Sequence, residues 1–313
     1  MKNSKKRNIN GTILLDKPIC ISSNKALQKI KQLFNAKKAG HTGTLDPIAT
    51  GMLPICFGEA TKFSQFLLNS NKEYIVIAKL GQRTDTSDSY GKIINERKVN
   101  FIKEDLYSAL NSFKGKTFQI PPMYSALKYK GKPMYKYAKK GIIINRSPRL
   151  ITINKIKYIR LENNELELEI HCLKGTYIRT IIDDLGELLG CGAHVIYLRR
   201  TKIYNYQNNQ MIKIEKLISL KTQINEGNGS YESLLDTLLL PIDSGITHLP
   251  VIKLNKNNEK RFIYGQCIYT RFKNSYAEQI IRVLNKDQNF LGIALINKNG
   301  DIFPKRLVNY YKQ

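Results

Sequence analysis

The sequence contains no long apolar segment. No stretch of its 313 residues approaches the about 20 consecutive apolar residues that a helix needs to cross a bilayer. The apolar run at residues 13–15 follows a basic N-terminus and ends at Asp16, Lys17 and Pro18, so it is too short for the core of a signal peptide. We therefore expect a cytoplasmic protein with no membrane partner.

Cysteines are few, and they show neither a metal-binding nor a disulfide pattern. No two of the five are separated by two residues, the spacing that zinc knuckles use, and their scatter indicates no disulfide framework. We expect reduced thiols in the core. The five are Cys20, Cys56, Cys172, Cys191 and Cys267.

Acidic residues are half as frequent as basic ones. The chain has 25 Asp and Glu against 51 Lys and Arg, a formal net charge of +26. An excess of this size favours a polyanionic partner, most simply nucleic acid, because each neutralised phosphate releases counterions. The abundance of Lys, Asn and Ile, typical of a low-GC genome, accounts for part of the charge. With 42% apolar and 24% charged residues, the composition is that of a globular protein.

One stretch, residues 39–54, stands out from the rest. Its sixteen residues include three glycines, two prolines and three threonines, which predicts an irregular loop rather than a helix or a central strand. It carries one acid, Asp46, which Pro47 biases towards an extended conformation, and one imidazole, His41. These features fit an active-site loop. They also fit an ordinary turn in which Asp46 caps a short helix and His41 lies on the surface.

The order of residues in this stretch closely resembles the catalytic motif of the TruB family of pseudouridine synthases. The matching strings are Gly40-His41-Thr42-Gly43-Thr44-Leu45-Asp46-Pro47, Ala49-Thr50-Gly51, Leu53-Pro54 and Gly58-Glu59-Ala60-Thr61-Lys62. Three later strings resemble other motifs of the family. They are Lys72-Glu73-Tyr74, Lys174-Gly175-Thr176-Tyr177-Ile178-Arg179-Thr180 and Gly192-Ala193-His194-Val195-Ile196-Tyr197-Leu198-Arg199-Arg200.

The resemblance implies three catalytic residues. Asp46 would be the essential carboxylate, acting either as nucleophile at C1′ or as base at C2′. Arg179 would form an ion pair that keeps Asp46 ionised and oriented. Tyr74 would stack on the target base and accept the C5 proton. Without the resemblance, a tyrosine at this position would simply be a side chain packed at a sheet edge.

The resemblance also implies a substrate pocket. His41 would occupy or support the space that the base leaves, and Tyr177 and Leu198 would complete the pocket. The isomerisation oxidises nothing and transfers no external group, so no cofactor is expected. No metal is expected either, because Asp85 and Asp88 lack a third ligand and are better explained as Asx-turns.

Apolar patterns predict both helices and strands. Periodicity indicates a helix over residues 24–34 with Ser22 or Ser23 as its N-cap, and a strand at residues 166–172. Residues 74–78 are rich in β-forming residues and predict another strand. A second helix follows Gly175. Arg179 lies in its first turn, away from the apolar stripe, where a cation opposes the helix dipole. Local mismatches of this kind often mark functional sites.

Together with the resemblance, these patterns predict an α+β fold. Residues 1–10 would be a flexible basic arm, and residues 11–248 a catalytic domain with a mixed central sheet and flanking helices, the pseudouridine synthase fold. Residues 222–233 would be a loop or linker. Residues 249–313, with a hairpin around Asn299-Gly300, would form a small β-rich, PUA-like RNA-binding domain.

The region from about residue 120 to 150, called the insertion below, is rich in interleaved tyrosine and lysine. This composition offers stacking faces and phosphate contacts together, as RNA-binding surfaces do. The family places a mobile, RNA-contacting insertion at this position. A helix with lysines on its solvent face would have the same composition.

The function implied is the isomerisation of a specific uridine in the T-loop of tRNA (tRNA position 55) to pseudouridine, by a monomer with no protein partner. Two alternatives stay open, a guide-dependent rRNA pseudouridine synthase and a tRNA-folding chaperone without catalysis. A glycoside hydrolase would need a second positioned carboxylate, for which Asp85 and Asp88 offer no recognisable context.

Overall fold

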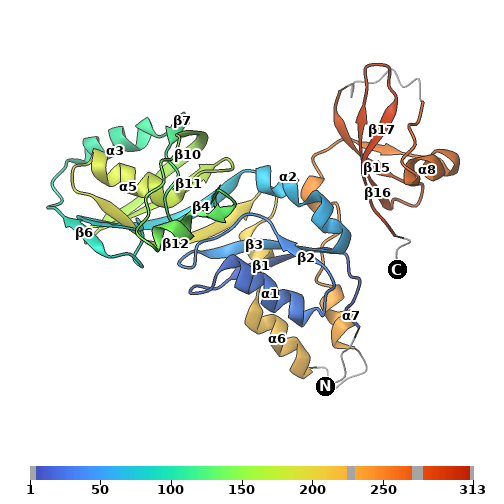
Figure 1. The fold of residues 1–313 in the computed structure, drawn as a ribbon, viewed down its shortest axis with the longest axis horizontal. Helices are drawn as coiled ribbons and strands as arrows, with labels where there is room; N and C mark the ends of the chain where they lie inside the picture. The colour runs from blue at the N-terminus through green and yellow to red at the C-terminus, as the bar shows by residue number, and fades with distance from the viewer. Residues whose placement is uncertain (1–4, 224–229, 270–277, 311–313) are drawn as a thin grey trace.

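The computed structural model describes residues 5–223, 230–269 and 278–310 of the chain. A nine-stranded sheet dominates it, with hydrogen-bonded order β13-β1-β3-β12-β4-β11-β10-β7 and β2 paired to β3 (Figure 1). The β1–β13 and β3–β12 pairs are parallel and the others antiparallel, so the sheet is mixed, as predicted. The strands are β1 Gly11–Lys17, β2 Ala39–His41, β3 Thr50–Phe57, β4 Lys72–Leu80, β7 Gly115–Gln119, β10 Arg149–Glu162, β11 Glu165–Cys172, β12 Ala193–Ile203 and β13 Ile212–Lys213.

Helices flank this sheet in two groups. α1 and α6 lie beside β1 and β3, while α3 and α5 lie with β4, β7, β10 and β11 (Figure 1). Both groups contribute to one continuous core. Helix α1 begins as predicted, because the Ser22 side chain accepts a hydrogen bond from Lys25 N at 3.2 Å. The bounds are α1 Ser23–Leu33, η1 Gly58–Phe63, α2 Ser64–Asn69, α3 Lys103–Ser112, α5 Ile178–Leu188, α6 Ile214–Gln223 and α7 Tyr231–Asp236.

Smaller elements occupy the connections. β5 Gln82–Thr84 pairs with β6 Ile93–Glu96, and η2 Asn208–Gln210 precedes β13. The insertion contains the short pair β8 Lys128–Tyr129 and β9 Lys132–Pro133, followed by α4 Met134–Ala138. It leaves the sheet at the end of β7 and returns at the start of β10, two strands that pair with each other.

The prediction of an irregular loop over residues 39–54 is wrong at both ends. Residues 39–41 form β2, and β3 runs through Gly51 and Pro54 inside the sheet. The Pro54 carbonyl accepts from Thr42 N at 3.0 Å, so the imide nitrogen faces the same edge of β3, away from β1. On that edge β12 pairs only with residues 50–51 and β2 only with residues 55–57. The missing donor of Pro54 therefore falls between two partner strands and breaks no ladder.

The C-terminal region forms a separate four-stranded sheet, which confirms the β-rich domain. Its order is β14-β15-β16-β17, with α8 packed in the same core (Figure 1). The predicted hairpin is present as β16 and β17. The bounds are η4 Ser244–Ile246, β14 Val251–Lys253, α8 Lys256–Ile263, β15 Ile280–Leu284, β16 Phe290–Ile296 and β17 Ile302–Leu307.

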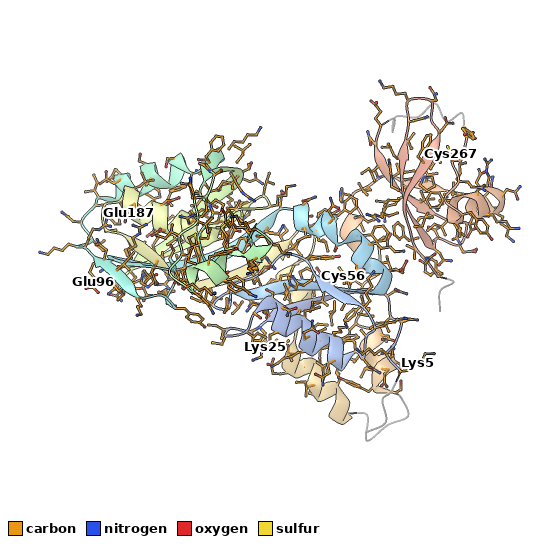
Figure 2. The ribbon with its side chains drawn as sticks, in the orientation of Figure 1. Lys5, Lys25, Cys56, Glu96, Glu187 and Cys267 are labelled. Atoms are coloured by element: carbon orange, nitrogen blue, oxygen red, sulfur yellow. The ribbon has the colours of Figure 1, made fainter. Side chains whose placement is uncertain are left out.

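A small apolar cluster joins this domain to the rest. The rings of Phe63 and Phe290 meet edge to face with centroids 5.1 Å apart. Lys62 Nζ donates to the Leu307 carbonyl at 2.8 Å, which fixes the end of β17 against η1. Figure 2 shows Cys56 and Cys267 in the two different regions, and all five cysteines are free thiols. No helix in the described part of the chain is long and apolar enough to span a membrane.

Two segments differ from their predicted character. Residues 1–4 of the basic arm lie outside the described residues, but Ile9 is buried in the core and Arg7 forms an ion pair with Asp236, so this part is not a free arm. In the segment expected to be a loop, residues 224–229 lie outside the described residues. Ser230 caps α7 by accepting from Ser233 N.

Candidate active site

The acid-bearing loop, residues 42–49, is fixed by its own backbone contacts. Ser23 Oγ both donates to the Leu45 carbonyl at 2.9 Å and accepts from Leu45 N at 2.8 Å. The Pro47 carbonyl accepts from Cys20 N at 2.9 Å. Helix α1 and the turn before it therefore hold both sides of Asp46, so that its carboxylate is placed by rigid neighbours.

Asp46 and Arg179 form the ion pair that the family resemblance implies. Arg179 Nε lies 2.9 Å from Asp46 Oδ2, although 133 residues separate them in the chain. The Arg179 side chain is 3% exposed, whereas that of Asp46 is 33% exposed. The pair thus presents a carboxylate to solvent, with its cation buried behind it.

The guanidinium of Arg179 has three further partners. It donates to the Thr86 carbonyl at 2.6 Å and the Tyr124 carbonyl at 2.8 Å, and lies 3.3 Å from Asp88 Oδ2. The prediction that Arg179 points away from the buried side of α5 is therefore wrong. Two carboxylates offset the cation at the start of this helix, which removes the expected conflict with the helix dipole.

Asp85 and Asp88 use their carboxylates within their own loop, as Asx-turns do. Asp88 Oδ1 accepts from Thr86 Oγ1 at 2.7 Å and from Tyr90 N at 3.0 Å. Asp85 Oδ1 accepts from Lys92 N at 2.8 Å. Sequence reasoning missed that Asp88 also faces Arg179, because nothing local in the sequence relates the two residues.

Tyr74 and Leu198 lie on one face of the sheet. Tyr74 is paired across β4 and β12 with Arg200, and Leu198 with Val76, so all four side chains share the face that α5 covers. Tyr74 is 7% exposed. Burial raises the pKa of its phenol, and the positive charge of Arg200 opposes that rise.

Tyr177 is the residue at which α5 begins, and a buried glutamine holds it. Gln119 Oε1 accepts from Tyr177 N at 2.9 Å, and Gln119 Nε2 donates to the Tyr177 carbonyl at 3.0 Å. Burial raises the pKa of the Tyr177 phenol, and the Ser125 hydroxyl of the insertion opposes this. Gln119, which sequence reasoning missed, thus joins the root of the insertion to the residue two positions before Arg179.

His41 ends β2 beside the acid-bearing loop. Burial lowers the pKa of its imidazole, and the charge of Arg200 lowers it further, so the ring is neutral at neutral pH. Its Nδ1 is buried without a hydrogen-bond partner among the described residues. A neutral ring with an unused polar atom suits a contact with a polar heterocycle.

Two buried cations beneath the loop were also missed. Lys17 is fully buried, and its Nζ donates to the Pro18 and Ile21 carbonyls at 2.8 Å each. Burial lowers the pKa of Lys17 to about 8, although the Asp46 carboxylate opposes this. Arg200, 1% exposed, lies under Gly43. The sequence could have indicated this position, because Arg200 follows Leu198 by two residues on a strand and alternate residues of a strand share a face.

The insertion stands next to this site through Tyr124 and Ser125. Tyr129 and Tyr137 meet edge to face with centroids 5.9 Å apart, and Lys130 Nζ lies 5.6 Å from the Tyr129 ring centroid. Tyr129 and Tyr135 are each 38% exposed. Aromatic faces and ammonium groups are therefore both available to a ligand on this segment.

Family models match almost the whole chain. Residues 31–178 match the TruB family pseudouridylate synthase (N terminal domain), and residues 179–247 match the tRNA pseudouridylate synthase B C-terminal domain. Residues 250–308 match the model described as pseudouridine synthase II TruB, C-terminal.

Relatives named tRNA pseudouridine synthase B match over the full length. One from Photorhabdus laumondii subsp. laumondii is 57% identical over 303 residues, 96% of each chain. One from Shewanella sp. (strain MR-4) is 51% identical over 313 residues, 100% of this chain and 98% of the relative.

Solved structures match the fold at low identity. A Cbf5-Nop10-Gar1 complex contains a chain that is 22% identical, with a TM-score of 0.72 over 95% of this chain and 84% of that one. An H/ACA RNP bound to a substrate RNA containing 2′-deoxyuridine gives 19% identity and a TM-score of 0.73, over 96% and 86% of the two chains. These likenesses establish the pseudouridine synthase fold.

Proposed function

The chain belongs to the TruB family of pseudouridylate synthases, and on that premise we propose that it isomerises one uridine in the T-loop of tRNA to pseudouridine. It would act as a cytoplasmic monomer, without metal, cofactor or protein partner. The observation that carries the proposal is the Asp46–Arg179 ion pair, in which a partly exposed carboxylate lies 2.9 Å from a buried guanidinium. A matching sequence alone would not guarantee this geometry.

Asp46 would act on the sugar. Breaking the N1–C1′ bond leaves its electron pair on the base, and Asp46 assists either by attacking C1′ or by removing a proton from C2′. The base then turns and rejoins through C5. Arg179 would hold the carboxylate in one orientation throughout, since its other contacts fix it to the backbone at Thr86 and Tyr124.

The target uridine must leave its stack to reach this carboxylate. Extruding a base costs a few kcal/mol, which the enzyme recovers through contacts in the pocket. Tyr74 would stack on the extruded base, and Tyr177 and Leu198 would close the pocket around it. His41, at the end of β2 beside the acid-bearing loop, would support the space that the base vacates.

The charge and the insertion would bind the RNA. A net charge of +26 provides the sequence-independent attraction to phosphates. The tyrosines and lysines of the insertion would contact the T-arm close to the site, because Tyr124 at its root touches Arg179 directly. The C-terminal β-rich domain would add a second RNA contact, as a PUA-like module does.

The guide-dependent alternative is less well supported. The structures that resemble this chain in complexes with other proteins are 22% and 19% identical, whereas the full-length relatives named for tRNA are 57% and 51% identical. A chaperone without catalysis would require none of the contacts between Asp46 and Arg179.

Tritium release tests the proposal. The substrate is a tRNA transcript labelled with [5-³H]uridine, incubated with the wild type or with Asp46→Asn, without added metal or guide RNA. We expect release by the wild type and none by the variant. Asparagine keeps the shape of the side chain, so tRNA binding should be unchanged. Asp85→Asn is the matched control, because the Asp85 carboxylate accepts a hydrogen bond from Lys92 N within its own turn.

The contrary outcomes separate the alternatives. Binding without release by the wild type would support a chaperone or a guide-dependent enzyme. Release by Asp46→Asn at the wild-type rate would remove Asp46 from the mechanism. Release from a transcript whose T-loop uridine is replaced by cytidine would contradict the assignment of the target.

A further inference from the structure

Arg200 is a buried cation without a carboxylate of its own. Its side chain is among the largest fully buried ones, and the residue is 1% exposed. Nε donates to the Met52 carbonyl at 2.8 Å and Nη2 to the Gly43 carbonyl at 2.9 Å. Within residues 5–223, 230–269 and 278–310, no carboxylate forms an ion pair with it. Burying an uncompensated guanidinium is costly, so it calls for an explanation beyond packing.

The surroundings of Arg200 are positive. Burial lowers the pKa of both Lys17 and Lys72 to about 8, and the charge of Arg200 contributes to lowering each of them. These three cations lie beneath the acid-bearing loop, where a group that gains negative charge during a reaction would be stabilised.

The closest group of that kind is the Tyr74 phenol. Arg200 and Tyr74 are directly paired across β12 and β4, on the face that carries Leu198. Neutral phenol is a poor base, and burial raises the pKa of Tyr74 further, whereas the charge of Arg200 opposes this. To accept a proton, Tyr74 must first be a phenolate. A fixed cation beside it would stabilise that anion.

We propose that Arg200 is a positioning residue that holds the Tyr74 phenol and stabilises it as a transient phenolate, so that Tyr74 carries the C5 proton of the substrate base to N1. The proposal rests on the proposed function and adds to it the path of this proton. In this scheme the positive charge of Arg200 stabilises Tyr74 in the one step in which this buried tyrosine becomes anionic. No carboxylate in the described part of the chain neutralises that charge.

The protons and electron pairs balance in this scheme. When the N1–C1′ bond breaks, N1 keeps the electron pair, and it takes the phenol proton of Tyr74. The new C5–C1′ bond forms with the electron pair of the C5=C6 bond, as C1′ gives up its bond to Asp46 or, in the other option, as C2′ regains its proton from Asp46. This leaves C5 bearing both the sugar and its hydrogen. The phenolate then removes the C5 hydrogen as a proton, the C5=C6 bond is restored, and Tyr74 is a phenol again.

Arg200 also aligns the two halves of the site. Its Nη2 holds the carbonyl of Gly43, three residues before Asp46, while its strand holds Tyr74. One guanidinium thus fixes the position of the carboxylate that acts on the sugar relative to the phenol that acts on the base.

The test compares three variants in single-turnover reactions. Arg200→Met removes the charge and keeps the length, and Arg200→Lys keeps the charge. Arg199→Met is the matched control, because Arg199 is the next residue on β12 and pairs with Asp16 through two 2.9 Å bonds on the opposite face. Each is measured with tRNA carrying [5-¹H] or [5-²H]uridine, and tRNA binding is measured in parallel.

We expect Arg200→Met to slow pseudouridine formation about 100-fold, the usual cost of one preorganised donor. Its 5-deuterium isotope effect should exceed that of the wild type, because proton removal from C5 becomes rate-limiting. Arg200→Lys should recover most of the rate, and Arg199→Met should match the wild type in rate and isotope effect. A purely structural role would slow every step and leave the isotope effect unchanged.

A slow Arg200→Met without an increased isotope effect, or an Arg200→Lys as slow as Arg200→Met, would overturn the proposal. If Arg200→Met does not fold, Arg200→Gln replaces it, since the Nε2 of a glutamine lies where Arg200 Nε does and can keep the bond to the Met52 carbonyl without the charge; the same two results decide. An inactive wild type would instead refute the proposed function, so the two failures are distinguishable.

Discussion

The guanidinium of Arg200 supports the acid-bearing loop, because its Nη2 donates a hydrogen bond to the Gly43 carbonyl at 2.9 Å. Gly43 has φ +80°, and a Cβ built on it would lie 3.4 Å from Arg200 Nη1 and 3.6 Å from Lys72 Cε. The acid-bearing loop therefore rests directly on two buried cations. A Cβ at these distances would make ordinary contacts, so it is the positive φ that favours glycine here.

Gly43→Ala should damage activity more than stability. The positive φ costs an alanine about 1 kcal/mol, and relief of this strain would shift the loop that carries Asp46 three residues later. Gly190→Ala is the control, because Gly190 has φ +75° with open space around its Cβ position. Urea denaturation should show similar losses for both variants, whereas tritium release should fall only in Gly43→Ala. Equal activity in the two would contradict the role given to this contact.

Arg179→Lys should reduce kcat by about 100-fold or more with little change in tRNA affinity. A lysine cannot contact Asp46, Thr86 and Tyr124 at once, and small misplacements of a catalytic group cost about this much. Arg83→Lys is the matched control, since Arg83 makes a similar two-point pair with Asp183 of the same helix at 2.7 and 3.0 Å. Single-turnover rates and filter-binding measure the two quantities. A lysine variant as active as the wild type would show that the fork geometry is not needed.

Because of Lys72, the free energy of unfolding should increase as the pH rises through the alkaline range. Its Nζ donates to the Leu68 and Ser70 carbonyls at 3.0 and 2.7 Å, and burial lowers its pKa from 10.5 to about 8. Below pH 8 the folded and unfolded chains both carry this charge, and the folded chain bears the cost of burying it. As the pH rises from 8 towards 10.5, only the unfolded chain keeps the proton, so this cost disappears and the group's contribution to stability increases.

Lys72→Met should lack that increase. Between pH 7.5 and pH 10 the free energy of unfolding should rise by about 2 kcal/mol more in the wild type than in the variant, from about 1.4 kcal/mol per pKa unit. Urea denaturation of both proteins at the two pH values gives the difference. Parallel changes in the two proteins would mean that Lys72 stays charged throughout.

Removal of divalent cations should leave turnover unchanged. The carboxylates of Asp85 and Asp88 accept hydrogen bonds from their own loop, and Asp88 also faces Arg179. Tritium release should therefore be equal with and without EDTA, once the tRNA has been folded in monovalent salt. A loss that only added Mg²⁺ restores, with tRNA folding unchanged by native gel, would contradict this expectation.

Much of the fold follows from local patterns. The residues of α1 and β11 have clear apolar periods and those of β4 are rich in β-formers, and the structure places all three within a few residues of the predicted bounds. The prediction failed at β3, where glycine and proline indicated a loop. Composition cannot reveal which edge of a strand is unpaired, and Pro54 is tolerated only because its nitrogen faces a gap between two partners.

The candidate site was predictable in its residue types and in the Asp46–Arg179 pair, but not in its other contacts. The order of residues around Asp46, Tyr74 and Arg179 identified the family before any contact was known. It could not show that Asp88 and the Tyr124 carbonyl share Arg179, or that Gln119 holds Tyr177. Those contacts join elements far apart in the chain, so no local spacing encodes them.

The sequence by itself determined the family and predicted the reactive carboxylate and a polyanionic partner, because motif order and net charge are properties of the linear chain. Only the tertiary structure decided which charges are compensated. Folding places two carboxylates beside Arg179. Beside Arg200, on the strand paired with that of Tyr74, it places carbonyl groups and a phenol. Burial and register set that difference, since the energy of a charge depends on the groups that folding brings around it.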